Sequence, residues 1–289
     1  MNIILAGISS NYGALLPGTE KAPSLLRQAG LVKTLGDTFH VKDLGDLKMP
    51  DNLSRHDQPP IRNWPAPQMV WDATRSLASK WFESDSFTLI LGGGCSTFTG
   101  IGAYWLDRYC DNAHILSIDH HIDAWQPNAT LCRGATSNTL WFLTHANPWL
   151  KSALVYPMSH VAVMGYDEET VTSEHDINGM DLYTRQALVQ AGIPNTAHHY
   201  LKALPQNAKV ILHLDLDVLA ETYIESVYAP SPAGLSPDDL KSLLVSLLKD
   251  RRIEGLMVTE FSGNTAAADQ DAENVVNWLC DSLKASLPH

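Results

Sequence analysis

Two carboxylates and two imidazoles lie within five consecutive positions of the chain, Asp119 to Asp123. They follow the apolar run His114-Ile115-Leu116, which predicts a short buried strand. In an extended segment alternate side chains share a face, so we expect Asp119, His121 and Asp123 to point one way. His120 then points the other way. Carboxylate oxygens and an imidazole nitrogen on one face are suitable ligands for a divalent metal ion.

A second pair of carboxylates, Asp215 and Asp217, ends another apolar run, residues 210–214. If the two strands are neighbours in one sheet, the two clusters can together hold two divalent cations. Such a centre would be a two-metal hydrolytic site, in which a bridging water loses a proton and attacks the substrate. Clusters of Asp and His at strand ends also cap helices and form turns, which is the alternative explanation. Carboxylates gathered without an attractive partner would repel one another or take up protons, which favours the metal.

The composition restricts the class of protein. With 289 residues, of which 45% are hydrophobic, the chain can bury a large core, and we expect one α/β domain over residues 1–289. Its 20 basic and 32 acidic residues give a net charge of −12. This balance, without a basic run, argues against nucleic acid or an anionic membrane as a partner. A small-molecule substrate is the expected partner.

The termini and the cysteines indicate a location. No apolar stretch reaches the length of a membrane span, and residues 1–7 lack the basic flank and cleavage site of a secretion signal. The cysteines are scattered rather than in CxxC pairs: Cys95, Cys110, Cys132 and Cys280. Free thiols in a reducing compartment are the simplest interpretation, so we expect a cytoplasmic location.

The elements that must position these residues alternate between strands and helices. Strands are expected at residues 2–8, 40–47, 87–91, 114–116, 160–164, 210–214 and 255–260, helices at 23–30, 68–83, 97–107, 183–192, 236–249 and 267–286, and a polar loop at 50–67. This alternation predicts a three-layer α/β fold with a mostly parallel central sheet between helices. Sites in such sheets lie beyond the carboxyl ends of the strands. Four candidate residues fall at that edge: Cys95, Asp119, Asp215 and Glu260.

The order of these motifs resembles the ureohydrolase superfamily, the binuclear manganese hydrolases that comprise arginases, agmatinases and formimidoylglutamases. The segments that carry the resemblance are Gly18-Thr19-Glu20-Lys21-Ala22-Pro23, Val41-Lys42-Asp43-Leu44-Gly45-Asp46, Gly92-Gly93-Gly94-Cys95-Ser96, Asp119-His120-His121-Ile122-Asp123, Asp215-Leu216-Asp217-Val218-Leu219, and Glu260 before Phe261-Ser262-Gly263-Asn264. They span nearly the whole chain in the family's order, and together they are specific. The resemblance implies an arginase-like fold, two divalent metal ions, with manganese expected, and a homo-oligomer, usually a trimer or hexamer.

The resemblance also implies roles for the metal ligands. Asp119 and Asp215 would bridge the two metals, with Asp123 completing the first site. His121 and Asp217 would complete the second site. A metal-bridging hydroxide would attack the carbon of a linear amidine or guanidine, and the tetrahedral intermediate would expel an amine.

The expected catalytic residues are Asp123 and Glu260. Glu260 would also bind the substrate by holding its cationic carbon–nitrogen group through a charge-assisted hydrogen bond. Arg133 and Asn138, in the segment after the first cluster, are the other candidate substrate contacts.

Cys95 departs from the family pattern, because a histidine that ligates the first metal stands at its position in family members. A thiolate ligand there would favour zinc, iron or cobalt over manganese. A thiol that does not ligate would leave the first site one ligand short. A buried core cysteine after a strand is the third interpretation.

Arg133 is the second departure. Arginases carry a histidine before a glycine, thought to shuttle protons, where this chain has Arg133-Gly134. Arginine stays protonated and cannot act as a general base near neutral pH. Formimidoylglutamases also lack the shuttle histidine and have three glycines where this chain has residues 92–94. Within the superfamily, the resemblance therefore slightly favours formimidoylglutamase. An arginine-like substrate remains the alternative.

Two further histidines accompany the clusters. His120 is expected to be packed or hydrogen-bonded behind the ligands rather than to ligate. His213 precedes Asp215 by two residues and so shares its face. It could be an extra ligand or base, but a strand histidine with satisfied hydrogen bonds is the expectation.

Two functions from different classes follow from these observations. The first is a metal-dependent hydrolase of a linear amidine or guanidine, such as formimidoylglutamate or an arginine-like substrate. The second is a diverged family member with an impaired first metal site that acts as a binding or structural protein. The retained carboxylates favour the enzyme, since a site without metal has little reason to keep them together. Cys95 and Arg133 favour the alternative.

Overall fold

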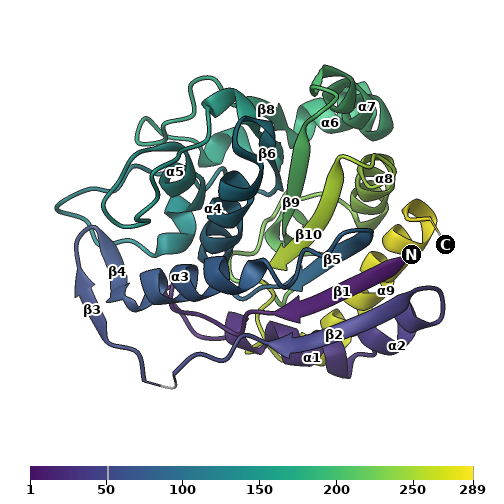
Figure 1. Cartoon of the computed structure of the whole chain (residues 1–289), viewed down its shortest axis with the longest axis horizontal. Helices are drawn as coiled ribbons and strands as arrows, with labels where there is room; N and C mark the ends of the chain where they lie inside the picture. The colour runs from purple at the N-terminus through teal and green to yellow at the C-terminus, as the bar shows by residue number, and fades with distance from the viewer. Residues whose placement is uncertain (51, 289) are drawn as a thin grey trace.

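A central sheet lies between two layers of helices in the computed structural model, which describes residues 1–50 and 52–288 (Figure 1). The main sheet has eight strands, and all of its neighbouring strands pair in parallel. In spatial order they are β2 (His40–Asp46), β1 (Asn2–Gly7), β5 (Ser86–Leu91), β10 (Ile253–Thr259), β9 (Lys209–Asp215), β6 (Ala113–Ile118), β7 (Val161–Tyr166) and β8 (Asp181–Thr184). The predicted three-layer α/β fold is confirmed.

Helices cover both faces of the sheet. They are α1 (Ala22–Gln28), α2 (Leu31–Gly36), α3 (Ala66–Ala78), α4 (Phe98–Tyr109), α5 (Thr139–Thr144), α6 (Arg185–Ala191), α7 (Ile193–Ala203), α8 (Pro237–Leu247) and α9 (Ala268–Ser286). Short 3-10 helices lie at Thr19–Lys21, Cys95–Thr97, Cys110–Asn112, Ala135–Asn138, Met158–His160, Glu168–Thr170 and Leu216–Val218. The apolar sides of α3, α4 and α5 pack on one face, and those of the other helices pack on the opposite face.

Two apolar clusters hold the layers together, one on each face of the sheet. Alternate residues of a strand enter different clusters: Leu212 and Leu214 of β9 pack on one side, whereas Ile211 packs on the other. A strand buried on both faces must be apolar at successive positions, which is why β5, β6 and β9 are nearly continuous hydrophobic runs in the sequence.

The prediction of a polar loop over residues 50–67 is wrong. The segment contains a second, two-stranded antiparallel sheet of β3 (Arg55–Gln58) and β4 (Ile61–Pro65). Its strands are short, and β3 is exposed along its whole length, so they lack the alternation of apolar and polar residues that identifies a half-buried strand. Strand β8 and helices α2, α5 and α7 were not predicted either. The helix expected at 183–192 begins only at Arg185, because Thr184 caps it by accepting from the Ala187 amide.

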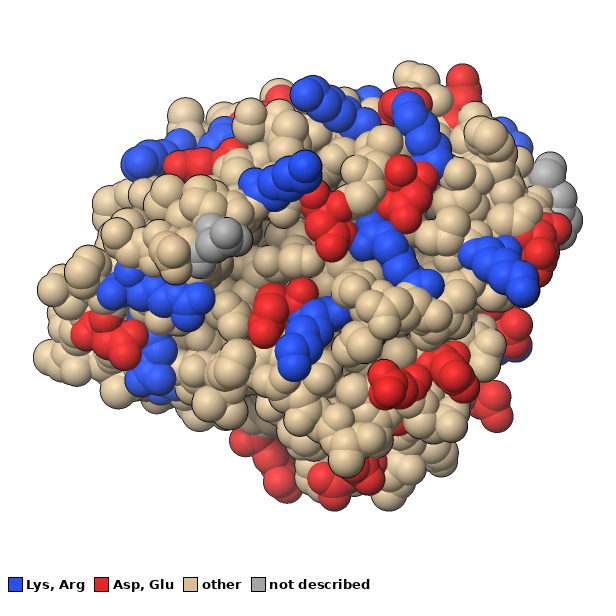
Figure 2. All heavy atoms as spheres, turned by 90° about the horizontal axis from the view of Figure 1, so that it is seen from below, with Lys and Arg blue, Asp and Glu red and all other residues tan. Residues whose placement is uncertain are grey.

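The surface carries both signs of charge. On the face shown in Figure 2, lysine and arginine side chains are interspersed with aspartate and glutamate. None of the helices in the described part of the chain combines the length and apolar character needed to cross a bilayer.

Four adjacent strands in the middle of the sheet, β5, β10, β9 and β6, determine where the candidate residues meet. The chain leaves each of these strands at the same edge, because the strands are parallel. Cys95, Glu260, Asp215 and Asp119 lie at or just beyond those four ends, in that spatial order.

Candidate metal centre

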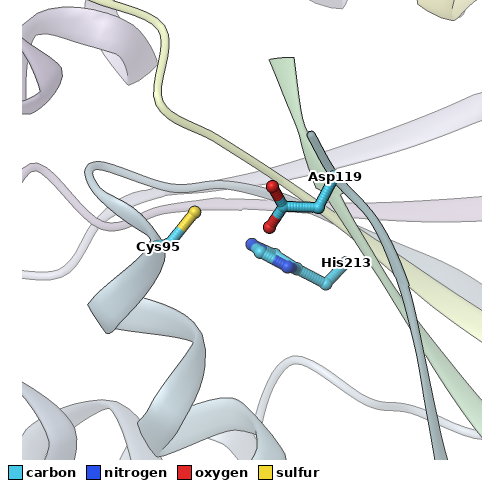
Figure 3. A group of neighbouring side chains, drawn as sticks. All are labelled: Cys95, Asp119 and His213. Carbon is cyan, nitrogen blue, oxygen red and sulfur yellow. The ribbon is translucent and has the colours of Figure 1, made fainter. Parts of the chain in front are cut away.

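Side chains from the four strand ends converge into overlapping groups. In each group, the potential ligand atoms all lie within 4.8 Å of one another. The groups are Cys95, Asp215 and Glu260; Asp119, His121 and Asp217; and Cys95, Asp119 and His213. Figure 3 shows the third group, with its side chains directed toward one another from three different segments. The two clusters recognised in the sequence therefore form one centre.

A repeated turn aligns the paired ligands. Oδ1 of Asp119 accepts from the His121 amide at 2.7 Å, and Oδ1 of Asp215 accepts from the Asp217 amide at 2.8 Å. Each aspartate thus bends the backbone back on itself just after a strand. We predicted that strand alternation would align Asp119 with His121, but the strand ends at Ile118 and the turn brings the two side chains together instead.

Glycines bring the loop after β5 close to the centre. A Cβ on Gly93 would lie 1.8 Å from the carbonyl oxygen of Ser10, and one on Gly94 would lie 3.0 Å from Oε1 of Glu260. The glycines at these positions are therefore explained by close backbone packing. This packing places Cys95, the next residue, against Glu260.

Cys95 is buried and in contact with the carboxylates. Its thiol donates to Oδ2 of Asp215 at 2.6 Å and lies 3.1 Å from Oγ1 of Thr259. Its backbone amide donates to Oε1 of Glu260 at 2.6 Å. Burial, and then the charges of Asp215 and Glu260, raise the pKa of the thiol well above its usual value. The thiol is therefore protonated at neutral pH in the absence of a cation.

The protein supplies too little positive charge to balance the buried carboxylates if all of them are ionised. Burial, and then neighbouring carboxylates, raise the pKa of Asp119 and Asp215 well above the usual value. Burial raises the pKa of Asp123 to about 7 and that of Glu260 to about 8. Oε2 of Glu260 is buried and has no hydrogen-bond partner among the described residues. Cations are the partners that such a set of oxygens fits.

His121 provides positive charge inside the cluster. Its Nδ1 lies 3.0 Å from Oδ2 of Asp217 and 3.9 Å from Oδ1 of Asp119. Burial opposes its protonation, but the hydrogen bond and charge of Asp217 outweigh burial and raise the pKa of His121 to about 9. A proton on His121 occupies the position where a metal ion would bind the same nitrogen.

Two residues of the centre have left-handed backbone conformations. Asp123 has φ 53° and Glu260 has φ 64°. Aspartate adopts this region more readily than most residues, whereas glutamate seldom does. Hydrogen bonds fix both: the Asp123 carbonyl accepts from the Leu140 amide at 2.9 Å, and the Glu260 amide donates to the Gly93 carbonyl at 3.0 Å. Such strain concentrates at functional sites.

Two histidines lie behind the carboxylates. His120 is buried, and its Nδ1 lies 3.0 Å from the hydroxyl of Ser231, as expected for a residue that points away from His121. His213 is also buried, between the hydroxyls of Ser117 and Thr259 at 2.9 and 2.8 Å. Burial lowers the pKa of His213 to about 3, so its ring is neutral.

The two predicted substrate contacts after the first cluster differ in exposure. Arg133 is partly exposed and stacks on the ring of Trp125, 3.6 Å from its centroid, while its Nη2 lies 3.2 Å from Oε2 of Glu174. Asn138 is buried, and its side-chain amide donates to the Trp125 carbonyl at 2.7 Å. Both residues thus contact the segment that carries Trp125, and their contact with substrate stays a prediction.

Thr259 and Ser117 were missed in the sequence. Each supplies a hydroxyl that fixes the ring of His213, and Thr259 also contacts Cys95. A hydroxyl residue inside an apolar strand was the available signal, but only the register between strands shows which ring it reaches.

Comparisons with known proteins agree with the fold and identify the family of the chain. Residues 1–284 match the sequence model of the Arginase family. The chain is 25% identical over 236 residues to the arginase of Staphylococcus aureus (strain COL), covering 78% of this chain and 77% of that protein. It is 24% identical over 267 residues to the formimidoylglutamase of Salmonella heidelberg (strain SL476), covering 89% and 74%. The crystal structure of Entamoeba histolytica arginase with L-ornithine aligns over 98% of both chains, with a TM-score of 0.84 and 16% identity, a likeness of fold.

Proposed function

Because the chain belongs to the arginase family, whose model spans residues 1–284, we propose that it is a metal-dependent hydrolase that cleaves a C–N bond of a linear amidine or guanidine. The observation that carries this proposal is the convergence of four carboxylates, two imidazoles and a thiol at the ends of adjacent parallel strands. The hydrogen-bond donors around them leave Oε2 of Glu260 without a partner among the described residues. A centre so rich in negative charge is stable when it holds cations.

The residues that would hold two divalent ions follow from the grouping. Asp119, His121 and Asp217 form one ligand group, and Asp119 also belongs to the group of Cys95 and His213. Asp215 forms a further group with Cys95 and Glu260. Asp119 and Asp215 lie at the ends of the adjacent strands β6 and β9, and they would be shared between both ions. Asp123 would complete the first site. When bound, a pair of divalent ions lowers the pKa of a water molecule between them and so supplies the nucleophile.

Glu260 would orient the substrate. Its Oε1 is held by the Cys95 amide, and its Oε2 is free to accept a hydrogen bond from a cationic amidine or guanidine. Holding that group fixes the carbon against the ligand cluster, because the same carboxylate belongs to the group of Cys95 and Asp215. Asp123, with its raised pKa, is the candidate that would take the proton of the attacking hydroxyl group and deliver it to the leaving amine.

Arg133 favours a substrate that carries a negative charge at its other end. The guanidinium stays charged and stacks on Trp125, where its only ionic partner among the described residues is Glu174. A carboxylate could compete for the remaining N–H donors of Arg133. Formimidoylglutamate and arginine both carry a carboxylate, whereas agmatine has an amine at that end. We therefore expect the former pair to be preferred.

A diverged, non-catalytic protein is the second candidate, and Cys95 is the observation that favours it. The Cys95 thiol is protonated and hydrogen-bonded to Asp215. In that state Cys95 is not a ligand of the first site, and it would become one only if a metal ion displaced the thiol proton. If that site fails to bind metal, the chain would retain the fold and one cation at most.

Elemental analysis combined with a substrate screen tests the proposal. The purified full chain is incubated with Mn²⁺, Zn²⁺ or Fe²⁺, desalted and analysed, then assayed with formimidoylglutamate, arginine, agmatine and guanidinobutyrate. Two metal ions per chain with hydrolysis of one of these compounds supports the enzyme. One ion or none, with no hydrolysis, supports the second candidate instead.

A further inference from the structure

We propose that His213 supplies the imidazole ligand of the first metal site, in place of the histidine that Cys95 replaces at the end of β5. The ligand would thus come from a neighbouring region of β9 rather than from the loop after β5. This inference rests on the proposed function, because it concerns the same metal centre.

The position of His213 meets the requirement for a ligand. A ring nitrogen of His213, a carboxylate oxygen of Asp119 and the sulfur of Cys95 lie within 4.8 Å of one another, and all three residues are buried (Figure 3). An ion bound at about 2.0–2.3 Å places neighbouring ligand atoms roughly 3–4 Å apart. A small contraction between the His213 nitrogen and the Asp119 oxygen would therefore bring both within reach of one ion. His213 shares its strand face with Asp215, another carboxylate of the centre.

The ring is already oriented as metal-bound imidazoles are. Its Nδ1 lies 2.9 Å from the hydroxyl of Ser117, its direct neighbour on β6, and the ring of Phe98 stacks on it at 4.6 Å. Metal-binding histidines usually make such a hydrogen bond through the nitrogen that does not ligate. The bond to Ser117 leaves Nε2 on the side of Thr259 and Cys95.

Metal binding at Nε2 would leave no buried group without a partner. Nε2 now lies 2.8 Å from Oγ1 of Thr259. The same hydroxyl is 3.4 Å from the Leu214 carbonyl and 3.1 Å from the Cys95 sulfur. Thr259 therefore retains hydrogen-bond partners when Nε2 turns to an ion, and the cost of an unsatisfied hydroxyl does not arise.

The small side chain at position 95 and the large one at position 213 are complementary. Both contact the hydroxyl of Thr259 inside the buried centre, so a histidine at position 95 would compete with His213 for the space around that hydroxyl. A histidine placed at 95 would overpack against His213. Replacing His213 with the smaller serine at the same time would remove that conflict.

The test compares the wild type with three variants of the full chain: His213→Ser, Cys95→Ser, and the double swap Cys95→His with His213→Ser. Each is titrated with Zn²⁺ and with Mn²⁺ alone, and bound metal is counted after desalting. X-ray absorption at the zinc edge then counts nitrogen and sulfur ligands. Thermal unfolding in chelator separates a loss of metal from a loss of folding.

We expect the wild type and Cys95→Ser to bind two ions, and His213→Ser to bind one while it stays folded in chelator. The double swap should recover the second ion, and zinc in His213→Ser should have fewer imidazole ligands. The affinity lost should exceed the roughly 10- to 100-fold typical of a residue that only supports a ligand. Two ions of unchanged affinity in His213→Ser, or loss of an ion in Cys95→Ser alone, would overturn the inference but leave the hydrolase intact. Fewer than two ions in the wild type would reject both.

Discussion

The backbone amide of Cys95 donates to Oε1 of Glu260 at 2.6 Å, whereas the other oxygen of that carboxylate has no partner among the described residues. The chain thus fixes one oxygen of Glu260 and leaves the second available. Because Glu260 also has a left-handed backbone, with φ 64°, its side chain is held at one place over the centre.

This relationship predicts the effect of Glu260→Gln. Glutamine keeps an oxygen for the Cys95 amide, so the loop should remain in place, but it loses the charge that binds a cationic substrate. We expect kcat/KM to fall about 30- to 5,000-fold, because losing one partner of a buried charged hydrogen bond costs roughly 2–5 kcal/mol. Steady-state kinetics check this, with metal content as the control. A variant with full activity would show that Glu260 does not bind substrate.

Much of the fold could be predicted because the central strands are buried on both faces. Strands such as β5 and β9 must be apolar at successive positions, and this is visible in a single sequence. The hairpin of β3 and β4 was missed because its exposed residues show no such pattern. Stability of that hairpin depends on contacts made elsewhere in the chain, which periodicity does not report.

The candidate site could be predicted only in part. Spacing identified Asp119 and Asp215 as strand-end carboxylates, and the pairing of β6 with β9 brings them together. The position of His213 depends on cross-strand register, since Ser117 and Thr259 come from strands distant in sequence. A sequence shows which residues can ligate, but not which of them share a cavity.

Substitution of His121 should reduce the number of bound metal ions, whereas substitution of the adjacent His120 should not. His121→Gln is expected to lose one of two bound ions, with metal affinity at that site reduced more than about 100-fold, because His121 lies beside Asp119 and Asp217. His120→Gln is the matched control and should bind two ions, since His120 bonds to Ser231 instead. Metal counting on both variants decides the matter. Equal losses in the two would contradict the assignment.

Arg133→Ala should raise KM and leave kcat within about twofold, because Arg133 lies at Trp125 rather than in the carboxylate cluster. We expect an increase of about 10-fold for a substrate with a carboxylate, consistent with roughly 1.5 kcal/mol for an ionic hydrogen bond. Arg75→Ala is the control: Arg75 pairs with Asp107 and is 26% exposed, against 29% for Arg133. If both variants behave alike, Arg133 does not recognise substrate.

The metal-free protein should lose stability as pH rises. The pKa of Asp123 rises from 3.8 to about 7 on folding, and that of Glu260 from 4.5 to about 8. The folded state therefore binds more protons than the unfolded state between about pH 4 and 8, and the free energy of unfolding falls through that window. His121, raised from 6.5 to about 9, acts in the same direction at higher pH. Its contribution is complete below pH 6.5 and is lost as pH approaches 9.

Thermal unfolding in chelator between pH 5 and 8.5 measures this effect. We expect Tm to fall by at least about 5 °C, since each kcal/mol corresponds to roughly 2–4 °C for a chain of this size. Added Mn²⁺ or Zn²⁺ should raise Tm more at pH 8 than at pH 5, because the ions compete with the protons on these carboxylates. Glu260→Gln removes one titrating group and should flatten the slope in chelator. A metal-free Tm that rises with pH would mean that the carboxylates find their positive partners within the protein.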